Sequence, residues 1–99
     1  MLLSDLHDAT LQSLSFNWAN ASATLTFELC AVESEFVIVE ASGVTNLQCP
    51  RVQPWGPSNS VNSAALETQA VGQLLTIEMQ SGDVIEIRCQ KARTELVPE

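Results

Sequence analysis

The apolar residues between Leu74 and Arg88 recur at every second position, and this period constrains the fold more than any other feature of the sequence. A period of two is that of a β-strand with one buried and one solvated face, whereas an amphipathic helix repeats about every 3.6 residues. Gly82 interrupts the alternation at its centre and can supply the positive φ that a short hairpin loop needs. The segment therefore predicts a β-hairpin.

The two faces of this hairpin restrict its register. A slip of one residue would bury Glu86, so odd-numbered residues must lie opposite odd-numbered residues. We expect Ile77 to pair with Ile87. The same register brings Glu78 close to Arg88 on the solvated face. The residues expected on the core face are Leu75, Ile77, Met79, Ile85, Ile87 and Cys89.

The same alternation occurs earlier in the chain, where residues 14–18 and 25–29 predict a first hairpin with its turn at 19–22. The continuous apolar run 36–39 is typical of a strand covered on both faces. Residues 44–49 predict a weaker strand that Pro50 ends, and a further strand begins near Ser60. The expected core is Leu14, Phe16, Trp18, Leu25, Phe27, Leu29, Val37, Val39, Ile77, Met79, Ile85 and Ile87.

These patterns predict an all-β fold of about six antiparallel strands with little helix, arranged as a sandwich or a partly open barrel. The length of 99 residues is enough for one domain, which we expect to span residues 1–99.

The charge of the chain restricts its partners. Twelve acidic residues face four basic ones, for a net charge of −8, and the first fifty residues hold six acids and no Lys or Arg. Such a surface disfavours nucleic acid and anionic membranes, which need clustered cations. It is compatible with a basic protein partner, although the acidity could equally serve only to keep the domain soluble.

Three further features predict a cytoplasmic location. The N-terminal residues 1–6 lack the basic region of a secretory signal, and the longest uncharged stretch, 9–27, holds too many polar residues for a membrane helix. The cysteines Cys30, Cys49 and Cys89 are odd in number and form no CxxC motif, which is typical of reduced thiols.

The sequence predicts no catalytic residue, no metal site and no cofactor. His7 is the single histidine, and we expect it and Asp8 to bond local backbone at the entry to the first strand. The carboxylates of Glu78 and Glu86 share the solvated face of the last hairpin, where a general acid would lack a raised pKa. We therefore expect a protein that is not an enzyme.

The segment around Trp55 is the predicted binding site. A Pro-Trp-Gly-Pro turn would hold the indole beside the hydroxyls of Ser58 and Ser60 and the amide of Asn62. Aromatic side chains flanked by adaptable polar groups are common on recognition surfaces. The alternative is structural, with Trp55 closing an open end of the sheet.

Three segments carry a resemblance to a known group of proteins. Residues 6–11 (LHDATL), residues 54–58 (PWGPS) with 60–62 (SVN), and residues 77–83 (IEMQSGD) resemble small uncharacterised bacterial β-rich proteins. Some members of that group are similar to immunity proteins of polymorphic toxin systems. The resemblance implies a β-sheet domain without an assigned reaction.

Two functions remain open at this point. The first is a non-enzymatic binding module, in the form of an immunity-like inhibitor of a basic protein partner. The second is a small-ligand-binding protein or a minor hydrolase-like enzyme with a pocket beside the Trp55 loop. We also expect a homodimer in which the basic C-terminal strand meets the acidic first half of a second copy, unless that strand neutralises acids within its own sheet.

Overall fold

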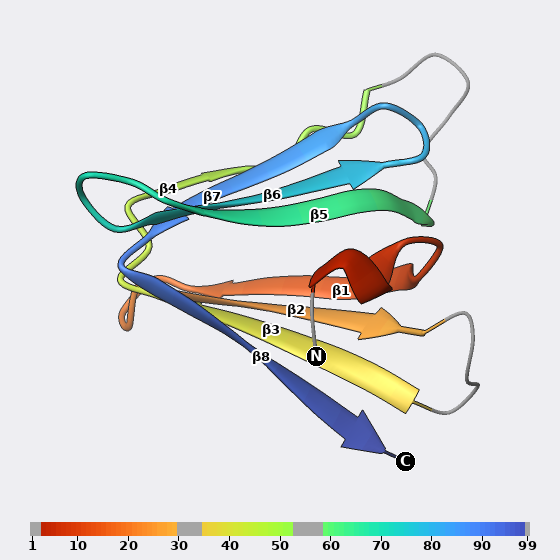
Figure 1. Cartoon of the computed structure of the whole chain (residues 1–99). Coiled ribbons are helices and arrows are strands. Elements are labelled where there is room, and N and C mark those ends of the chain that lie inside the picture. Colours follow the sequence, from red (N-terminus) through yellow and green to blue (C-terminus); the bar gives the residue numbers. More distant parts are fainter. Residues whose placement is uncertain (1–2, 30–34, 53–58, 99) are drawn as a thin grey trace.

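Eight β-strands form two four-stranded antiparallel sheets in the computed structural model, which describes residues 3–29, 35–52 and 59–98 (Figure 1). The first sheet has the order β1-β2-β3-β8, and the second has the order β4-β7-β6-β5. A short 3-10 helix, η1, precedes them at Leu3–Leu6. The strands are β1 Thr10–Asn17, β2 Ser22–Glu28, β3 Glu35–Ser42, β4 Asn46–Gln48, β5 Val61–Thr68, β6 Gln73–Met79, β7 Val84–Cys89 and β8 Lys91–Pro98.

The predicted all-β sandwich is confirmed, although the expected number of about six strands is too low. The C-terminal β8 follows β7 after the single residue Gln90, so one continuous run of chain supplies a strand to each sheet. Across the described ranges, no helix is long and apolar enough to cross a membrane.

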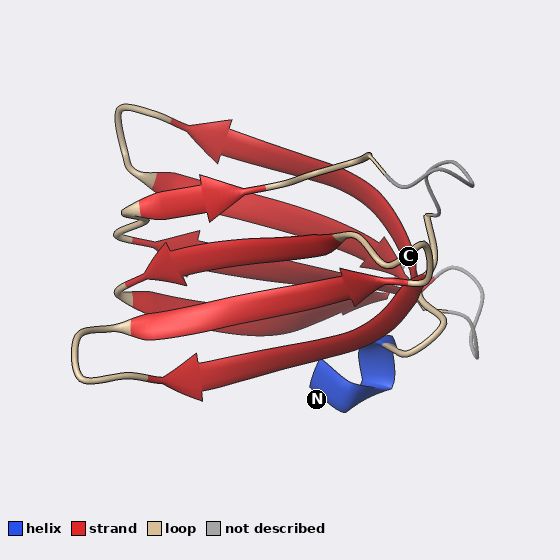
Figure 2. Ribbon diagram, turned by 90° about the horizontal axis from the view of Figure 1, so that it is seen from above, coloured by secondary structure: helices blue, strands red, loops and turns tan. Residues whose placement is uncertain are grey.

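The two sheets overlap as layers (Figure 2). They converge where β7 passes into β8, and they separate toward the opposite end (Figure 1). At the convergence, the Gln90 amide donates to the Ser42 carbonyl at 2.9 Å. Elsewhere, Thr10 at the start of β1 forms an antiparallel bridge with Ser60 just before β5.

The core between the sheets contains most of the residues that the alternation predicted. The prediction is confirmed for eight of them and for the inward position of Cys89, whereas Leu14 and Leu29 are half-buried. Those eight buried residues are Leu25, Phe27, Val37, Val39, Ile77, Met79, Ile85 and Ile87. In the run 36–39, Phe36 and Ile38 are half-buried on the outer face, so β3 is covered less completely than expected.

Two predicted core residues are exposed. Phe16 retains 37% and Trp18 retains 88% of its accessible surface. Trp18 lies after the end of β1, in the turn to β2, where the pleat no longer dictates which side chains point inward. The facing strand β4 has three residues, too few to cover the end of β1.

In the last hairpin, the predicted faces are confirmed and the predicted register is wrong. Ile77 pairs with Ile85 rather than with Ile87, a shift of two residues that leaves every side chain on its expected face. The turn closes with the Met79 amide donating to the Asp83 carbonyl at 2.8 Å, and Gly82 adopts a φ of 96° as expected. The predicted proximity of Glu78 and Arg88 is lost with the register, because Glu78 lies opposite Val84.

Candidate recognition groove

The predicted binding residues lie in different environments. Trp55 and Ser58 fall outside the described residues. Ser60 is half-buried in the bridge to Thr10, and its carbonyl accepts a hydrogen bond from the Gln80 amide at 2.9 Å. Asn62 is exposed, and its Nδ2 donates to Glu78 Oε1 at 2.6 Å. Both described members of the predicted site therefore contribute to contacts between strands.

His7 and Asp8 tie the entry of the first strand to the second sheet. His7 Nδ1 donates to the carbonyl of Asn62 at 2.6 Å, and Gln80 Nε2 donates to Asp8 Oδ1 at the same distance. We expected bonds to local backbone, whereas these partners lie far along the sequence. Asp8 also has a φ of 65°, a conformation that a short polar side chain tolerates. These hydrogen bonds of His7 and Asp8 join the two sheets, which gives both residues a structural role.

The described part of the chain holds no group of three or more His, Cys, Asp or Glu side chains arranged to bind a metal ion. Burial raises the pKa of the Cys89 thiol above its ordinary value, which keeps it in the neutral form. Cys49, by contrast, is exposed just after β4.

The stem of the Trp55 segment is anchored by a buried carboxylate. Asp83 Oδ1 accepts a hydrogen bond from the Val52 amide at 3.1 Å, and Asp83 Oδ2 accepts one from Ser81 Oγ at 2.9 Å. The described residues beside this stem line a hollow of about 90 Å³. That volume is well below the roughly 300 Å³ at which small-molecule sites begin.

A larger depression opens where β1 faces β4, and we call it the aromatic groove. It has a volume of about 470 Å³ and is lined by Phe16, Trp18, Ala21, Val44, Thr45, Asn46 and Leu47. The rings of Phe16 and Trp18 meet edge to face, with centroids 6.0 Å apart and planes at 84°. This geometry is a favourable one for two aromatic rings, so each ring restrains the other.

The turn that carries Trp18 is held by several hydrogen bonds. Asn17 Oδ1 accepts from the Asn20 amide at 3.0 Å, and the Trp18 carbonyl accepts from the Ala21 amide at 3.3 Å. The Ala21 carbonyl in turn accepts from the Val44 amide at 2.8 Å, which links this turn to the segment before β4. The exposed indole therefore projects from an anchored backbone.

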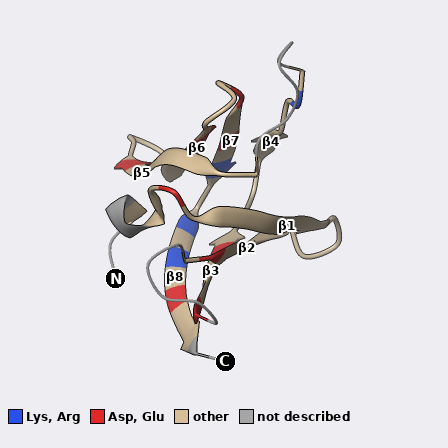
Figure 3. Ribbon diagram, turned by 90° about the vertical axis from the view of Figure 1, so that its right-hand side faces the viewer, with Lys and Arg blue, Asp and Glu red and all other residues tan. Residues whose placement is uncertain are grey.

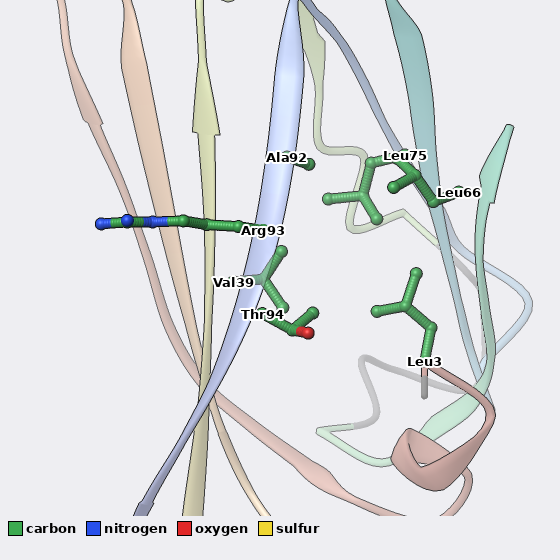
Figure 4. A pocket seen from close by; sticks show the side chains of 7 residues that line it. All are labelled: Leu3, Val39, Leu66, Leu75, Ala92, Arg93 and Thr94. Carbon is green, nitrogen blue, oxygen red and sulfur yellow. The ribbon is translucent and has the colours of Figure 1, made fainter. Parts of the chain in front are cut away.

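A second opening lies on the other side of the sandwich, where β8 faces β5 and β6, and we call it the inter-sheet cleft (Figure 4). Its volume is about 390 Å³. Figure 4 shows that Arg93 points away from it, toward the outer face of the first sheet, where its Nη2 lies 3.3 Å from Glu40 Oε1. The residues whose side chains face the cleft are Leu3, Val39, Leu66, Leu75, Ala92 and Thr94.

The edge strands beside the two openings differ in charge. None of the described residues that line the aromatic groove is charged, and β1 carries no charge along its length. Beside the inter-sheet cleft, β8 presents Lys91, Arg93 and Glu95 (Figure 3). Sequence reasoning missed the aromatic groove because it assigned Phe16 and Trp18 to the core. The signal that could have found it is the position of Trp18 at the end of the alternation, directly before the predicted turn.

Comparison with known proteins identifies a similar fold and does not indicate an activity. No family model matches the chain, and no curated protein has a significantly similar sequence. A solved structure similar to this chain is that of an uncharacterized protein from Neisseria gonorrhoeae. It has a TM-score of 0.73 at 16% identity, with 90% of this chain and 91% of that chain covered. At this identity the likeness shows that the two chains share the sandwich fold.

Proposed function

We propose that this chain is a non-catalytic binding module that recognises a basic protein partner through the aromatic groove. The observation that carries the proposal is Trp18, whose indole is 88% exposed on an anchored turn. Exposed aromatic side chains beside a hollow are characteristic of interaction sites, because burying them on binding removes a large apolar area from water.

The lining of the groove favours an apolar group of the partner. Val44 and Leu47 supply aliphatic surface, whereas Thr45 and Asn46 supply uncharged polar groups at the same depression. An apolar side chain flanked by a hydrogen-bonding backbone matches that combination.

Strand β1 offers the backbone part of such a site. It is an edge strand, and beyond its first residues, which pair with residues 59–60, no described strand covers its outer edge. An extended segment could add to this edge and place one side chain in the groove, as peptides do at other sheet edges.

The charge of the chain supports a basic partner. A net charge of −8 attracts cations over several ångströms and speeds their encounter with the protein. The resemblance to immunity proteins agrees with this choice, since an inhibitor of a basic toxin needs an acidic surface. We place this function in the cytoplasm, where cysteines such as the unbridged Cys49 and Cys89 are kept reduced.

Tryptophan fluorescence tests the proposal directly. In a Trp55→Phe background, Trp18 is the single indole, so its emission reports on the groove alone. We expect a lysine-rich peptide with a central leucine to shift this emission to the blue, and a glutamate-rich counterpart to leave it unchanged. A matching response to both peptides would contradict a basic partner.

Substitution at the groove provides the second arm. Measured by calorimetry, Trp18→Ala should weaken peptide binding by about tenfold or more, the loss expected for an aromatic interface residue. The matched control is Val71→Ala, because Val71 is 91% exposed in the loop between β5 and β6. Equal peptide affinities of the two variants would show that the groove does not bind the peptide.

A small apolar ligand is the second candidate, favoured by the volume of about 470 Å³, which lies in the usual range of ligand sites. Salt separates the two candidates. Added salt weakens the binding of a basic partner, whereas it leaves the binding of a neutral ligand nearly unchanged.

A further inference from the structure

Strand β8 differs from the other three edge strands in charge and in regularity. It carries Lys91, Arg93 and Glu95, whereas β1 and β4 have no charged residue and β5 has Glu67 alone. The register of β1 and of β5 shifts at a bulge, and β4 has three residues, but β8 pairs with β3 without a shift. Regular edge strands invite a further strand, because bulges and short lengths prevent pairing. Charged side chains on an edge also oppose pairing, unless the incoming strand places opposite charges across from them.

The pairing pattern identifies which backbone groups of β8 face outward. The Leu29 amide donates to the Glu35 carbonyl, so odd-numbered residues of β3 bond toward β2 and even-numbered residues bond toward β8. In the β3–β8 register, the even-numbered residues of β8 then direct their amides and carbonyls to the free edge. The Ala92 amide agrees with this assignment, since it donates to Gln73 Oε1 rather than to β3.

Charge selects one register for a second copy of β8. Antiparallel pairing centred on Thr94 places Arg93 opposite Glu95 of the second copy, twice by symmetry. Pairing centred on Arg93 would oppose two arginines, and pairing centred on Glu95 would oppose two glutamates. Opposite charges directly across a sheet stabilise the pair and like charges destabilise it. Pairing centred on Arg93 also places Lys91 opposite Glu95 at two positions. Among the residues of β8, the Thr94 register is distinguished because it alone combines two attractive pairs with no like-charge pair.

The side chains of β8 fit the same register. Within its own sheet Glu95 lies opposite Ile38, and among the described residues it makes no ion pair. Arg93 already pairs with Glu40, so Glu95 of a second copy would flank it on the other side. On the inner face, Ala92 would lie opposite Leu96 of the second copy.

We infer that β8 is the dimerisation edge of this protein, pairing with β8 of a second copy around a two-fold axis through Thr94. The amide and carbonyl of Thr94 bond those of Thr94 in the other copy, and the Leu96 amide donates to the carbonyl of Ala92 there. The arrangement differs from the expected contact between the C-terminal strand and the acidic first half of a second copy. It goes beyond the proposed function, because β1 is at the opposite edge of the same sheet.

The dimer also accounts for the apolar surface on this side of the molecule. Leu96 is 44% exposed on β8, and Leu66 is 37% exposed at the facing strand β5. Leu66 lines the inter-sheet cleft, and Leu96 lies two residues beyond Thr94, which also lines it, on the same face of β8. A second copy would cover this side. A two-fold pairing uses the same edge on both copies, so the assembly closes at two chains and forms no fibre.

Analytical ultracentrifugation of the full chain at micromolar concentrations and low salt is the first test. We expect a mass twice the 10.7 kDa of the chain. Glu95→Lys should weaken this dimer by about tenfold or more, because it places a lysine opposite Arg93 at both pairs while removing no ion pair from the monomer. A monomeric parent protein would overturn the inference.

Mixing two variants gives a sharper test. Glu95→Lys and Arg93→Glu should each sediment as monomers, and an equimolar mixture should form a heterodimer, because both cross-strand pairs are then attractive again. Association in the mixture alone would support the register, since no loss of folding produces a partner-dependent result of this kind. Failure of the mixture to associate, with both variants folded by circular dichroism, would overturn the register.

A backbone test separates strand pairing from contact of side chains. Thr94→Pro removes an outward amide and costs no bond to β3, so the monomer keeps its fold and loses the dimer. The matched control is Thr68→Pro in β5, whose amide faces the free edge of the second sheet by the same alternation. A dimer that survives Thr94→Pro, with both variants folded by circular dichroism, would exclude pairing through β8.

Discussion

The aromatic groove and the inter-sheet cleft open on opposite sides of one sandwich, and their edge strands suit different partners. At the groove, β1 is uncharged and ends beside the rings of Phe16 and Trp18. At the cleft, β8 carries both signs of charge and its inward side chains are aliphatic or small. An uncharged edge specifies no register, so selectivity there must come from side chains in the groove. A charged edge specifies its own register, which a second copy satisfies in the proposed dimer.

The comparison also shows what the two openings share. Both are bounded by strands that pack on one apolar core, in which Phe27 is the largest fully buried side chain. A change in that core should affect both sides, whereas a change at either opening should affect one.

The largest expected effect comes from Phe27→Ala. Loss of the buried ring together with the cavity it leaves should lower the free energy of unfolding by about 3–5 kcal/mol, measured by urea denaturation. Peptide binding and self-association should decline together as the folded fraction falls. Phe36→Ala, on the half-buried outer face of β3, is the control and should cost clearly less. A loss below about 1 kcal/mol for Phe27→Ala would contradict its place in the core.

A matched pair of substitutions should distinguish the function of the aromatic groove from that of the inter-sheet cleft. Phe16 and Leu66 are each 37% exposed, one at the groove and one at the cleft. Each alanine variant should lose about 1–2 kcal/mol of stability, because part of each side chain is buried. Phe16→Ala should weaken peptide binding in calorimetry and leave the sedimentation mass unchanged, and Leu66→Ala should do the reverse. The same functional loss in both variants would show that the two openings do not act as separate sites.

Thiol reactivity compares the surface beside β4 with the core face of β7. In a Cys30→Ser background, Cys49 should react with an aromatic disulfide reagent at least about tenfold faster than Cys89. Burial raises the pKa of the Cys89 thiol, so at a given pH less of it is in the reactive thiolate form than for an ordinary cysteine. The reaction rate of Cys89 should therefore still increase with pH above the ordinary pKa of a thiol. Cys49→Ser and Cys89→Ser assign the two phases, and equal rates would contradict the burial of Cys89.

The smallest expected effect is on the stability of Trp18→Ala. Because the indole is almost fully exposed, its removal should change the free energy of unfolding by less than about 0.5 kcal/mol. Urea denaturation checks this, with Val71→Ala as the reference for an exposed apolar side chain. A loss above about 2 kcal/mol would show that Trp18 supports the fold and would weaken its assignment to binding.

Much of the fold could be predicted because every second side chain of a strand points to the same face of the sheet. Burial at Leu25 and Phe27 follows from alternation alone, as does the core face of the last hairpin. The candidate site could not be predicted in the same way. Phe16 continues the alternation of buried residues, and its exposure depends on how far the facing strand β4 extends.

The register of the last hairpin shows the limit of the pattern. Registers that differ by two residues keep every side chain on its face, so periodicity cannot distinguish them. The turn decides between them, through the Met79–Asp83 backbone bond and the Asp83 side chain, which bonds Ser81 and the distant Val52 amide.

The sequence by itself determined the strand period, the identity of most core residues, the acidic charge and the mixed signs on the C-terminal segment. The tertiary structure decided which strands form the edges, which side chains lie beyond the cover of the facing sheet, and which contacts join the two sheets. The physical reason is that the first set depends on residues near one another in the chain. The second depends on pairings such as His7 with Asn62 and Ser42 with Gln90, which form only once distant segments have met.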